Sequence, residues 1–413
     1  MSRRELFGQR SVVALLAAEV VSTTGSQMTW LALPWFVLVT TGSATQTSFV
    51  MAAEIIGLAL LGLPGGRFLA RLGARRTMIL CDGVRAPIML VIPVLHWTGG
   101  LTFAVLLIVA FVLGALAAPY FAAQKVVVPE LLGEDEQRVT EANALFQAAT
   151  RTTMLLGPAI GGVLIGVIGV TSVLLVDAGS YVVSAALVFL FLPRRPPLEQ
   201  KPEDNRVRVG LQFILRDPLL RIWSPAFAVG DAAWTAFFVT VPVLVLSRFG
   251  EDPKIAGWLF ASFGVGALIG NGISFRFLSR RYDGLGLIAA CVMGQAIPLW
   301  LLWLPLPAIA LSGAIVVSGI ANGLVNPSLH TIMTLRIPAA LRPNVMTTAM
   351  VFWALLNPLG LFLAGPILDS FGTTPVLIAF ALTQTVCMAA AGLAAARERG
   401  RRRLVPVLEP TSG

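Results

Sequence analysis

Charged residues, histidines and cysteines are all scarce in this 413-residue chain. Asp, Glu, Lys and Arg make up 12% of it, against about 25% in soluble domains. The histidines are His96 and His330, and the three cysteines (Cys81, Cys291 and Cys387) are isolated from one another, without metal-ligand or redox spacing. We therefore expect no metal site, no cofactor and no enzymatic chemistry.

Two further patterns are missing from the sequence. No Gly-rich loop runs into Lys-Ser or Lys-Thr, the arrangement with which P-loop proteins hold ATP phosphates. No segment alternates polar and apolar residues over about ten positions, as the strands of a membrane barrel do. If the chain transports a solute, an ion gradient is the remaining energy source.

Long apolar runs fill most of the chain, since 56% of its residues are hydrophobic. A helix that crosses a bilayer needs about 20 predominantly apolar residues. We predict an all-α membrane protein with twelve transmembrane helices, at 11–38, 45–66, 77–97, 101–124, 142–165, 171–192, 222–247, 255–275, 284–304, 307–334, 344–367 and 374–396. The basic start precedes an apolar stretch too long for a cleavable signal, so we expect none.

The sequence also repeats itself in the same direction. Arg67-Phe68-Leu69-Ala70-Arg71 recurs 209 positions later as Arg276-Phe277-Leu278-Ser279-Arg280. Further landmarks recur at nearly the same offset: Pro34, Gly42 and Gly57 as Pro242, Gly250 and Gly266. Parallel repeats are typical of secondary transporters whose substrate site lies between two halves. We predict two six-helix halves related by pseudo-two-fold symmetry, at 1–192 and 222–396, with a linker at 193–221 and a basic tail at 397–413.

The basic residues predict the orientation in the membrane. With both termini in the cytoplasm, 26 of the 30 Lys and Arg face the cytoplasm, which satisfies the positive-inside bias. The net charge of +9 is then explained by the orientation of the chain in the membrane, and we expect no nucleic-acid partner. Within the linker, Val209 to Leu220 has the apolar spacing of a helix that lies along the membrane surface.

Several short motifs follow one another in a recognisable order. They are Gly66 to Arg76, Asp82-Gly83-Val84-Arg85, Pro129 to Leu132 with Glu141 to Leu145, Gly157-Pro158-Ala159-Ile160-Gly161-Gly162, and Gly210 to Pro218. Together they resemble the major facilitator superfamily, and within it the drug-efflux branch of macrolide-type and tetracycline-type pumps and the enterobactin exporter. The resemblance covers nearly the whole chain.

The resemblance implies roles for two of these motifs. It implies a cytoplasmic gate motif that includes Gly66, Arg71, Gly73, Arg75, Arg76, Asp82 and Arg85. It also implies an exporter motif at Gly157, Pro158, Gly161 and Gly162. The chain departs from the family at Ala70, where the gate motif has an acid, and at Ser26, where the branch often has an Asp. Asp82 is our candidate for the missing acidic partner of Arg71 or Arg75.

Acids within the spans are the candidates for proton coupling. A charged group at the centre of a spanning helix costs about 2.5–3.5 kcal/mol on insertion scales, so each should face a cavity or a partner. We name Asp231, Glu19 and Glu54 as coupling acids, with Arg151 as a partner. Asp177 is a fourth candidate, with a structural role as the alternative.

Helical spacing places polar and aromatic residues along single faces of the first, seventh and tenth spans. By family resemblance these spans line a central cavity, for which we name Thr23, Gln27, Trp30, Trp234, Phe238, Asn322, Asn326 and Trp353. The alternative is that these side chains make interhelical hydrogen bonds and packing contacts. An aromatic, largely apolar pocket suits a bulky amphiphile or lipophilic cation.

The leading functional hypothesis is therefore a proton-coupled exporter of small lipophilic compounds, a monomer in a bacterial plasma membrane. A lysophospholipid or siderophore transporter is an alternative. A non-transporting membrane sensor is another.

The predicted topology can be tested by cysteine labelling, in a variant that lacks the three native cysteines. Because the basic residues place both termini inside, a cysteine at Ser2 or Ser412 should stay unlabelled by an impermeant external reagent in intact cells. Labelling of either position would show that the topology is wrong.

Overall fold

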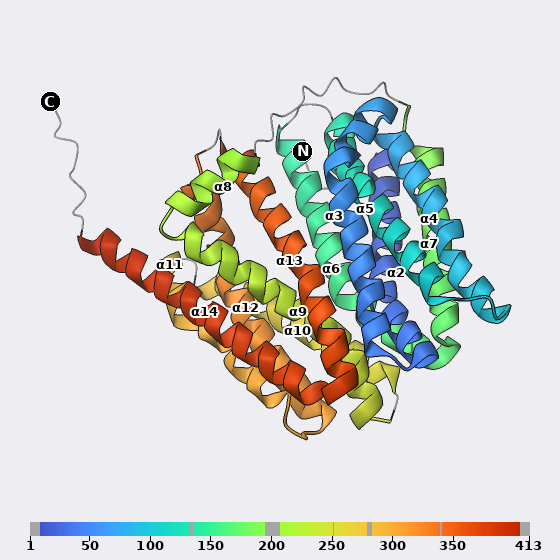
Figure 1. Ribbon diagram of the computed structural model, residues 1–413. Coiled ribbons are helices and arrows are strands. Elements are labelled where there is room, and N and C mark those ends of the chain that lie inside the picture. The colour runs from blue at the N-terminus through green and yellow to red at the C-terminus, as the bar shows by residue number, and fades with distance from the viewer. Residues whose placement is uncertain are drawn as a thin grey trace. The chain divides into compact units, whose positions relative to one another are not determined.

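The computed structural model describes residues 9–132, 136–194, 207–250, 252–278, 283–338 and 341–404. Within these ranges the chain is helical and contains no β-strand, which confirms the predicted fold class. The N-terminal part forms helices α2 (Arg10–Thr41), α3 (Ala44–Leu72), α4 (Ala74–Trp97), α5 (Phe103–Leu132), α6 (Glu136–Ile168) and α7 (Val170–Phe191) (Figure 1).

The remaining helices begin with the short α8 (Val207–Arg216), which lies within the predicted surface segment. It is followed by α9 (Leu220–Arg248), α10 (Pro253–Ile273) with the π-helical turn η1 (Ser274–Leu278), α11 (Gly284–Cys291), the 3₁₀ segments η2 (Val292–Gln295) and η3 (Ile297–Leu301), α12 (Ala308–Arg336), α13 (Arg342–Phe371) and α14 (Thr373–Leu404).

The helices match the predicted spans closely. Among the described residues, ten stretches are long and apolar enough to cross a membrane, and Leu355–Phe371 within α13 is a shorter apolar helix. The first predicted span, 11–38, is covered by α2. This helix is not among those ten, and it carries Glu19, Gln27 and several hydroxyl side chains.

The ninth predicted span, 284–304, differs from a continuous α-helix. After α11 ends at Cys291, the chain continues through η2 and η3 to Leu301. Pro298 lies at the start of η3 and has no N–H to donate to an α-helical hydrogen bond. The segment therefore keeps its apolar character but loses α-helical geometry.

Two compact units can be separated by their internal packing. Unit 1 comprises Met1–Glu203, Phe238–Ala261 and Pro358–Thr373, and unit 2 comprises Asp204–Phe237, Ser262–Asn357 and Thr374–Gly413. The division follows packing and cuts across α9, α10 and α13. The two six-helix halves of the sequence repeat remain a prediction.

In unit 1, α2 packs against α6 and α7, α3 against α5, and α4 against α5 and α7. The contact between α3 and α5 is close enough for backbone to touch backbone. A Cβ at Gly57 would overlap the carbonyl oxygen of Phe111, and a Cβ at Gly114 would overlap that of Glu54. Small residues of this kind let membrane helices approach closely.

Unit 2 has the same kind of close glycine contact between α10 and α12. A Cβ at Gly266 would overlap the carbonyl oxygen of Val316, and a Cβ at Gly319 would overlap that of Phe263. Gly57 and Gly266 are the same landmark in the two copies of the sequence repeat. Each unit therefore contains one copy of the same helix contact.

These glycines should tolerate no larger side chain. Gly266→Leu places a side chain against backbone atoms of α12, and overpacking typically costs about 1–3 kcal/mol. We expect loss of monodisperse protein in size-exclusion chromatography of detergent extracts. Gly272→Leu, on the same helix but with open space around its Cβ position, is the matched control. Equal yields of the two variants would contradict the assignment of this contact.

Candidate functional site

A buried arginine lies at the centre of a polar cluster in unit 1. Arg85, in the middle of α4, is 5% exposed, and its guanidinium carbon lies 4.2 Å from the centroid of the Tyr181 ring. Its Nη1 lies 3.6 Å from Oδ1 of Asp82, one turn earlier on the same helix. A cation at this depth needs partners, and α7, which packs on α4, supplies others.

Asp177 on α7 is the best-satisfied acid of this cluster. It is fully buried, and it accepts hydrogen bonds from Thr29 Oγ1 (2.6 Å) and Ser180 Oγ (3.1 Å). It also interacts electrostatically with Arg85. Gly25 makes room for it, because a Cβ there would collide with the Asp177 and Ser180 side chains.

Ser26, where related exporters often carry an Asp, lies beside this acid. Its hydroxyl is 3.1 Å from the Tyr181 hydroxyl, one turn of α7 beyond Asp177. Ser26 therefore contacts the stretch of α7 that carries Asp177. Sequence spacing alone does not reveal this, because the two helices are 148 residues apart where Thr29 meets Asp177.

Asp82 does not pair with Arg71 or Arg75. It is fully buried, its ion pair is with Arg85, and the hydroxyl that interacts with it is that of Ser184 on α7. Arg75 instead donates from Nη2 to the Phe189 carbonyl at 2.6 Å. The proposed replacement of the gate acid by Asp82 therefore finds no support in these contacts.

The rest of the gate motif is simple to place. Arg71 and Arg76 are exposed, and Gly73, with φ of 79°, forms the junction between α3 and α4. The side chains of residues 62–68, which include the position of Gly66, lie outside the described part of the chain.

Glu54 and Glu19 lie on helices that flank the cluster. Glu54 is half-buried on α3 and interacts electrostatically with Arg85 and Asp177. Glu19 on α2 is 2% exposed; its Oε1 accepts a hydrogen bond from Thr150 at 2.9 Å, while its Oε2 has no described partner. Arg151 is exposed and forms no ion pair with a described acid.

In unit 2, Asp231 forms a smaller polar site on α9. Its Oδ2 accepts a hydrogen bond from Asn357 Nδ2 at 2.9 Å, and the buried Oδ1 of Asn357 has no described partner. Trp234, one turn along α9, is in ring contact with Phe237, Phe263 and Phe380. A carboxylate and a cluster of aromatic rings therefore lie on neighbouring turns of one helix.

The other predicted cavity residues are only partly brought together. Trp30 and Phe238 meet edge to face at 6.1 Å within unit 1, and Phe238 also contacts Phe260. Thr23 is buried, and Gln27, Asn322 and Asn326 are half-buried. The side chain of Trp353 lies outside the described residues.

The exporter motif is a close-packed stretch of α6 within unit 1. A Cβ at Gly157 would overlap the Gln27 side chain, and one at Gly161 would lie 3.1 Å from the Cα of Met28. On the other side, a Cβ at Gly162 would lie 2.9 Å from the Cα of Gly257 on α10. Pro158 lies inside the helix. These contacts explain why small residues are needed here.

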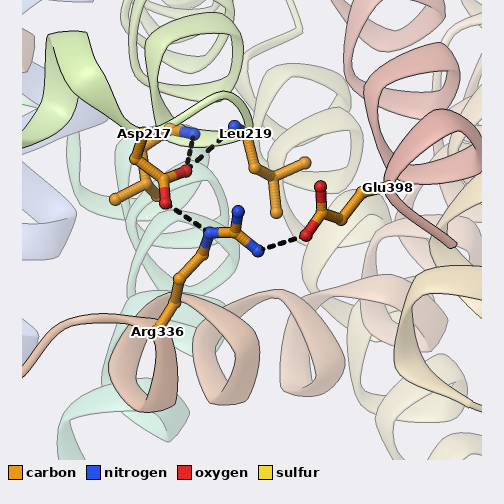
Figure 2. A network of polar contacts seen from close by, with 5 residues as sticks. Asp217, Leu219, Arg336 and Glu398 are labelled. Carbon is orange, nitrogen blue, oxygen red and sulfur yellow. Dashed lines mark hydrogen bonds and ion pairs between the residues drawn. The ribbon is translucent and has the colours of Figure 1, made fainter. Parts of the chain in front are cut away.

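A charge network in unit 2 was missed by sequence reasoning (Figure 2). Arg336, at the end of α12, forms ion pairs with Asp217 through Nε and with Glu398 on α14 through Nη1 (2.7 Å). Oδ1 of Asp217 accepts hydrogen bonds from the backbone N–H groups of Leu219 and Leu220 (both 2.9 Å), at the start of α9. The Asp-Pro pair after α8 was the available sequence signal.

A second missed contact lies in unit 1. The Asp369 carboxylate, near the end of α13, accepts hydrogen bonds from the N–H groups of Ala44 (2.7 Å) and Thr45 (2.9 Å) and from the Ser43 hydroxyl (2.9 Å). It thereby caps the N-terminus of α3, where backbone donors have no intrahelical acceptor. No sequence signal links positions so far apart.

Comparisons with known proteins agree with this architecture. The Major Facilitator Superfamily model matches residues 15–361. The chain is 28% identical to the multidrug efflux pump Tap of Mycolicibacterium fortuitum, over 90% of this chain and 92% of that protein. It is 26% identical to the pump of the same name from Mycobacterium tuberculosis strain H37Rv, over 94% of each chain.

Solved structures support the same fold. A nucleoside transporter, NupG, aligns with a TM-score of 0.73 at 14% identity, over 94% of this chain and 99% of that one. A POT family transporter in complex with a peptide conjugate aligns with a TM-score of 0.67 at 13% identity, over 94% of this chain and 96% of that one. The chain is therefore a multi-pass membrane protein that belongs to the major facilitator superfamily, with drug efflux pumps among its relatives.

Proposed function

We propose that this protein exports small lipophilic or amphiphilic compounds across the bacterial plasma membrane, in exchange for protons. Its relatives named as multidrug efflux pumps, matched over at least nine-tenths of this chain, support the export of drug-like compounds. The two six-helix halves would expose a midplane site to each side of the membrane in turn. Both termini lie in the cytoplasm, and the monomer is the working unit.

The observation that carries the proposal is the Asp231 site. The hydrogen-bond partner of this carboxylate is the neutral amide of Asn357, and no ion pair joins Asp231 to a described base. Trp234 and its neighbouring rings lie one turn away. Aromatic faces attract cations within about 6 Å, and an uncompensated carboxylate attracts them further. The site therefore suits a lipophilic cation. When no such cation is bound, the Asp231 carboxylate can bind a proton instead.

Glu19 supports coupling in the N-terminal part of the chain. Its described hydrogen-bond partner is also neutral, the hydroxyl of Thr150. An isolated ionised carboxylate is costly to bury, so such a group tends to bind a proton or a cation. Two acids with neutral partners, one in each unit, fit a cycle in which proton binding and substrate binding are linked.

Transport in proteoliposomes tests this function. With ethidium as the lipophilic cation, an imposed proton gradient should drive uphill efflux by the wild type. Asp231→Asn should lose ethidium binding and efflux, because the neutral amide cannot pair with the cation. Glu19→Gln should lose uphill efflux but keep substrate exchange, because a side chain that cannot lose a proton uncouples the cycle. Asp252→Asn, which alters an acid outside the predicted spans, is the control.

Several outcomes would contradict the proposal. Full uphill efflux in both Asp231→Asn and Glu19→Gln would rule out coupling through these acids. Counterflow of a labelled lysophospholipid or siderophore without counterflow of any drug would favour those substrates instead. Binding of ethidium without flux would indicate a sensor.

A further inference from the structure

The acids around Arg85 outnumber the bases. Besides Arg85, the ionisable or hydroxyl groups that face Asp82 come from four helices: Glu19 on α2, Cys81 on α4, Tyr120 on α5, and Asp177, Tyr181 and Ser184 on α7. Glu54 on α3 faces Arg85 and Asp177. With Asp82 itself the cluster contains four carboxyls, whereas Arg85 is its single base among the described residues. All of them lie in helices predicted to cross the membrane, where net charge is costly.

Asp177 is the acid built to remain ionised. Thr29 donates to one of its oxygens, Ser180 shares its hydroxyl proton between the other oxygen and the Asp177 carbonyl, and Arg85 interacts with it electrostatically. A buried ion pair is tolerated when further hydrogen bonds satisfy its remaining lone pairs. One ionised carboxylate is enough to compensate Arg85. Asp177 has the hydrogen-bond donors that stabilise an ionised form, whereas Asp82 lies at ion-pair distance, 3.6 Å from Arg85 Nη1.

Asp82 is in the opposite situation. It is as deeply buried as Asp177, yet the Ser184 hydroxyl is the one hydrogen-bonding group among the described residues that interacts with it, and that hydroxyl also lies 3.2 Å from the Tyr120 hydroxyl. Its distance from Arg85 Nη1, 3.6 Å, is longer than a hydrogen bond. An ionised Asp82 would add a second, poorly compensated negative charge to the cluster, whereas a protonated Asp82 adds none.

We propose that Asp82 is a proton-carrying acid of the N-terminal half, and that Asp177 is the permanent counter-ion of Arg85. This inference rests on the proposed proton coupling. It assigns to Asp82 a role apart from the cytoplasmic gate, and it adds a proton site to the acids Glu19 and Asp231.

The exchange needs one proton and a small movement. On loading, a proton from water forms an O–H bond with one carboxylate oxygen of Asp82. On release, that bond breaks, its electron pair stays on the carboxylate, and the proton leaves with water. Arg85 then moves the short distance to Asp82 and compensates the new charge, while Thr29 and Ser180 continue to donate to Asp177.

Infrared difference spectroscopy of the purified full-length protein in nanodiscs tests the proton directly, without substrate. Near neutral pH, the wild type should show the C=O stretching band of a protonated carboxyl group that loses its proton as pH rises. Asp82→Asn should weaken that band, because one of the protonated carboxyl groups is gone, whereas Asp252→Asn should leave its intensity unchanged. A band of unchanged intensity in Asp82→Asn would overturn the proposal.

Thermal unfolding of the same samples separates the two acids. Asn resembles a protonated Asp, so Asp82→Asn should unfold close to the wild-type temperature. Asp177→Asn leaves Arg85 without its counter-ion and should unfold at a clearly lower temperature. If Asp82 were simply a structural partner of Arg85, both variants would be destabilised alike, and that result would overturn the proposal.

Transport links the proton to coupling. Asp82→Asn should reduce uphill ethidium efflux to the level of empty vesicles while ethidium exchange continues. Retained uphill efflux in Asp82→Asn would overturn the coupling role of Asp82. A weaker infrared band in Asp82→Asn, combined with wild-type efflux that does not depend on the proton gradient, would instead overturn the proposed function and leave Asp82 as a proton site.

Discussion

Close approach of backbones is the constraint on which the rest of this structure depends. Lipid tails are as apolar as leucine, so helices in a membrane gain little by hiding apolar side chains from them and associate through packing and hydrogen bonds. Gly57 and Gly114 allow this between α3 and α5, and Gly266 and Gly319 allow it between α10 and α12. The buried polar groups follow from it, because Gly25 lets α2 come near enough for Thr29 to donate to Asp177.

The polar groups of the spans fall into two kinds. Some are fully compensated: Asp177 has two hydroxyl donors and a cation, and Arg336 has two acids. Others are left short of partners, as Asp82, Glu19 Oε2 and Asn357 Oδ1 are among the described residues. Compensated groups stabilise one arrangement of helices. At groups that lack partners, protonation or ligand binding changes the free energy of the protein most.

Much of the fold could be predicted from the sequence, because long apolar runs are a direct consequence of crossing a bilayer many times. The break after Cys291 was not predicted, since hydropathy does not report whether a span is α or 3₁₀. In the site, Asp82 and Arg85 lie three positions apart on a helix, a spacing that brings side chains together. The family motif drew attention to Arg71 and Arg75 instead. Contacts between distant helices, such as Thr29 with Asp177, left no trace in a single sequence.

The cap that Asp369 places on α3 has a genetic consequence. Two of the three groups that it accepts from are main-chain N–H groups, which every residue type except proline provides. Substitution of Ala44 by any residue except proline leaves its donor in place, whereas substitution of Thr45 also removes a side-chain hydroxyl that interacts with Asp369. The contact is lost through changes at position 369, because Asp369 is the described acceptor for the N–H groups of both Ala44 and Thr45. The N–H of Gln46 would keep its own acceptor, the Ser43 hydroxyl.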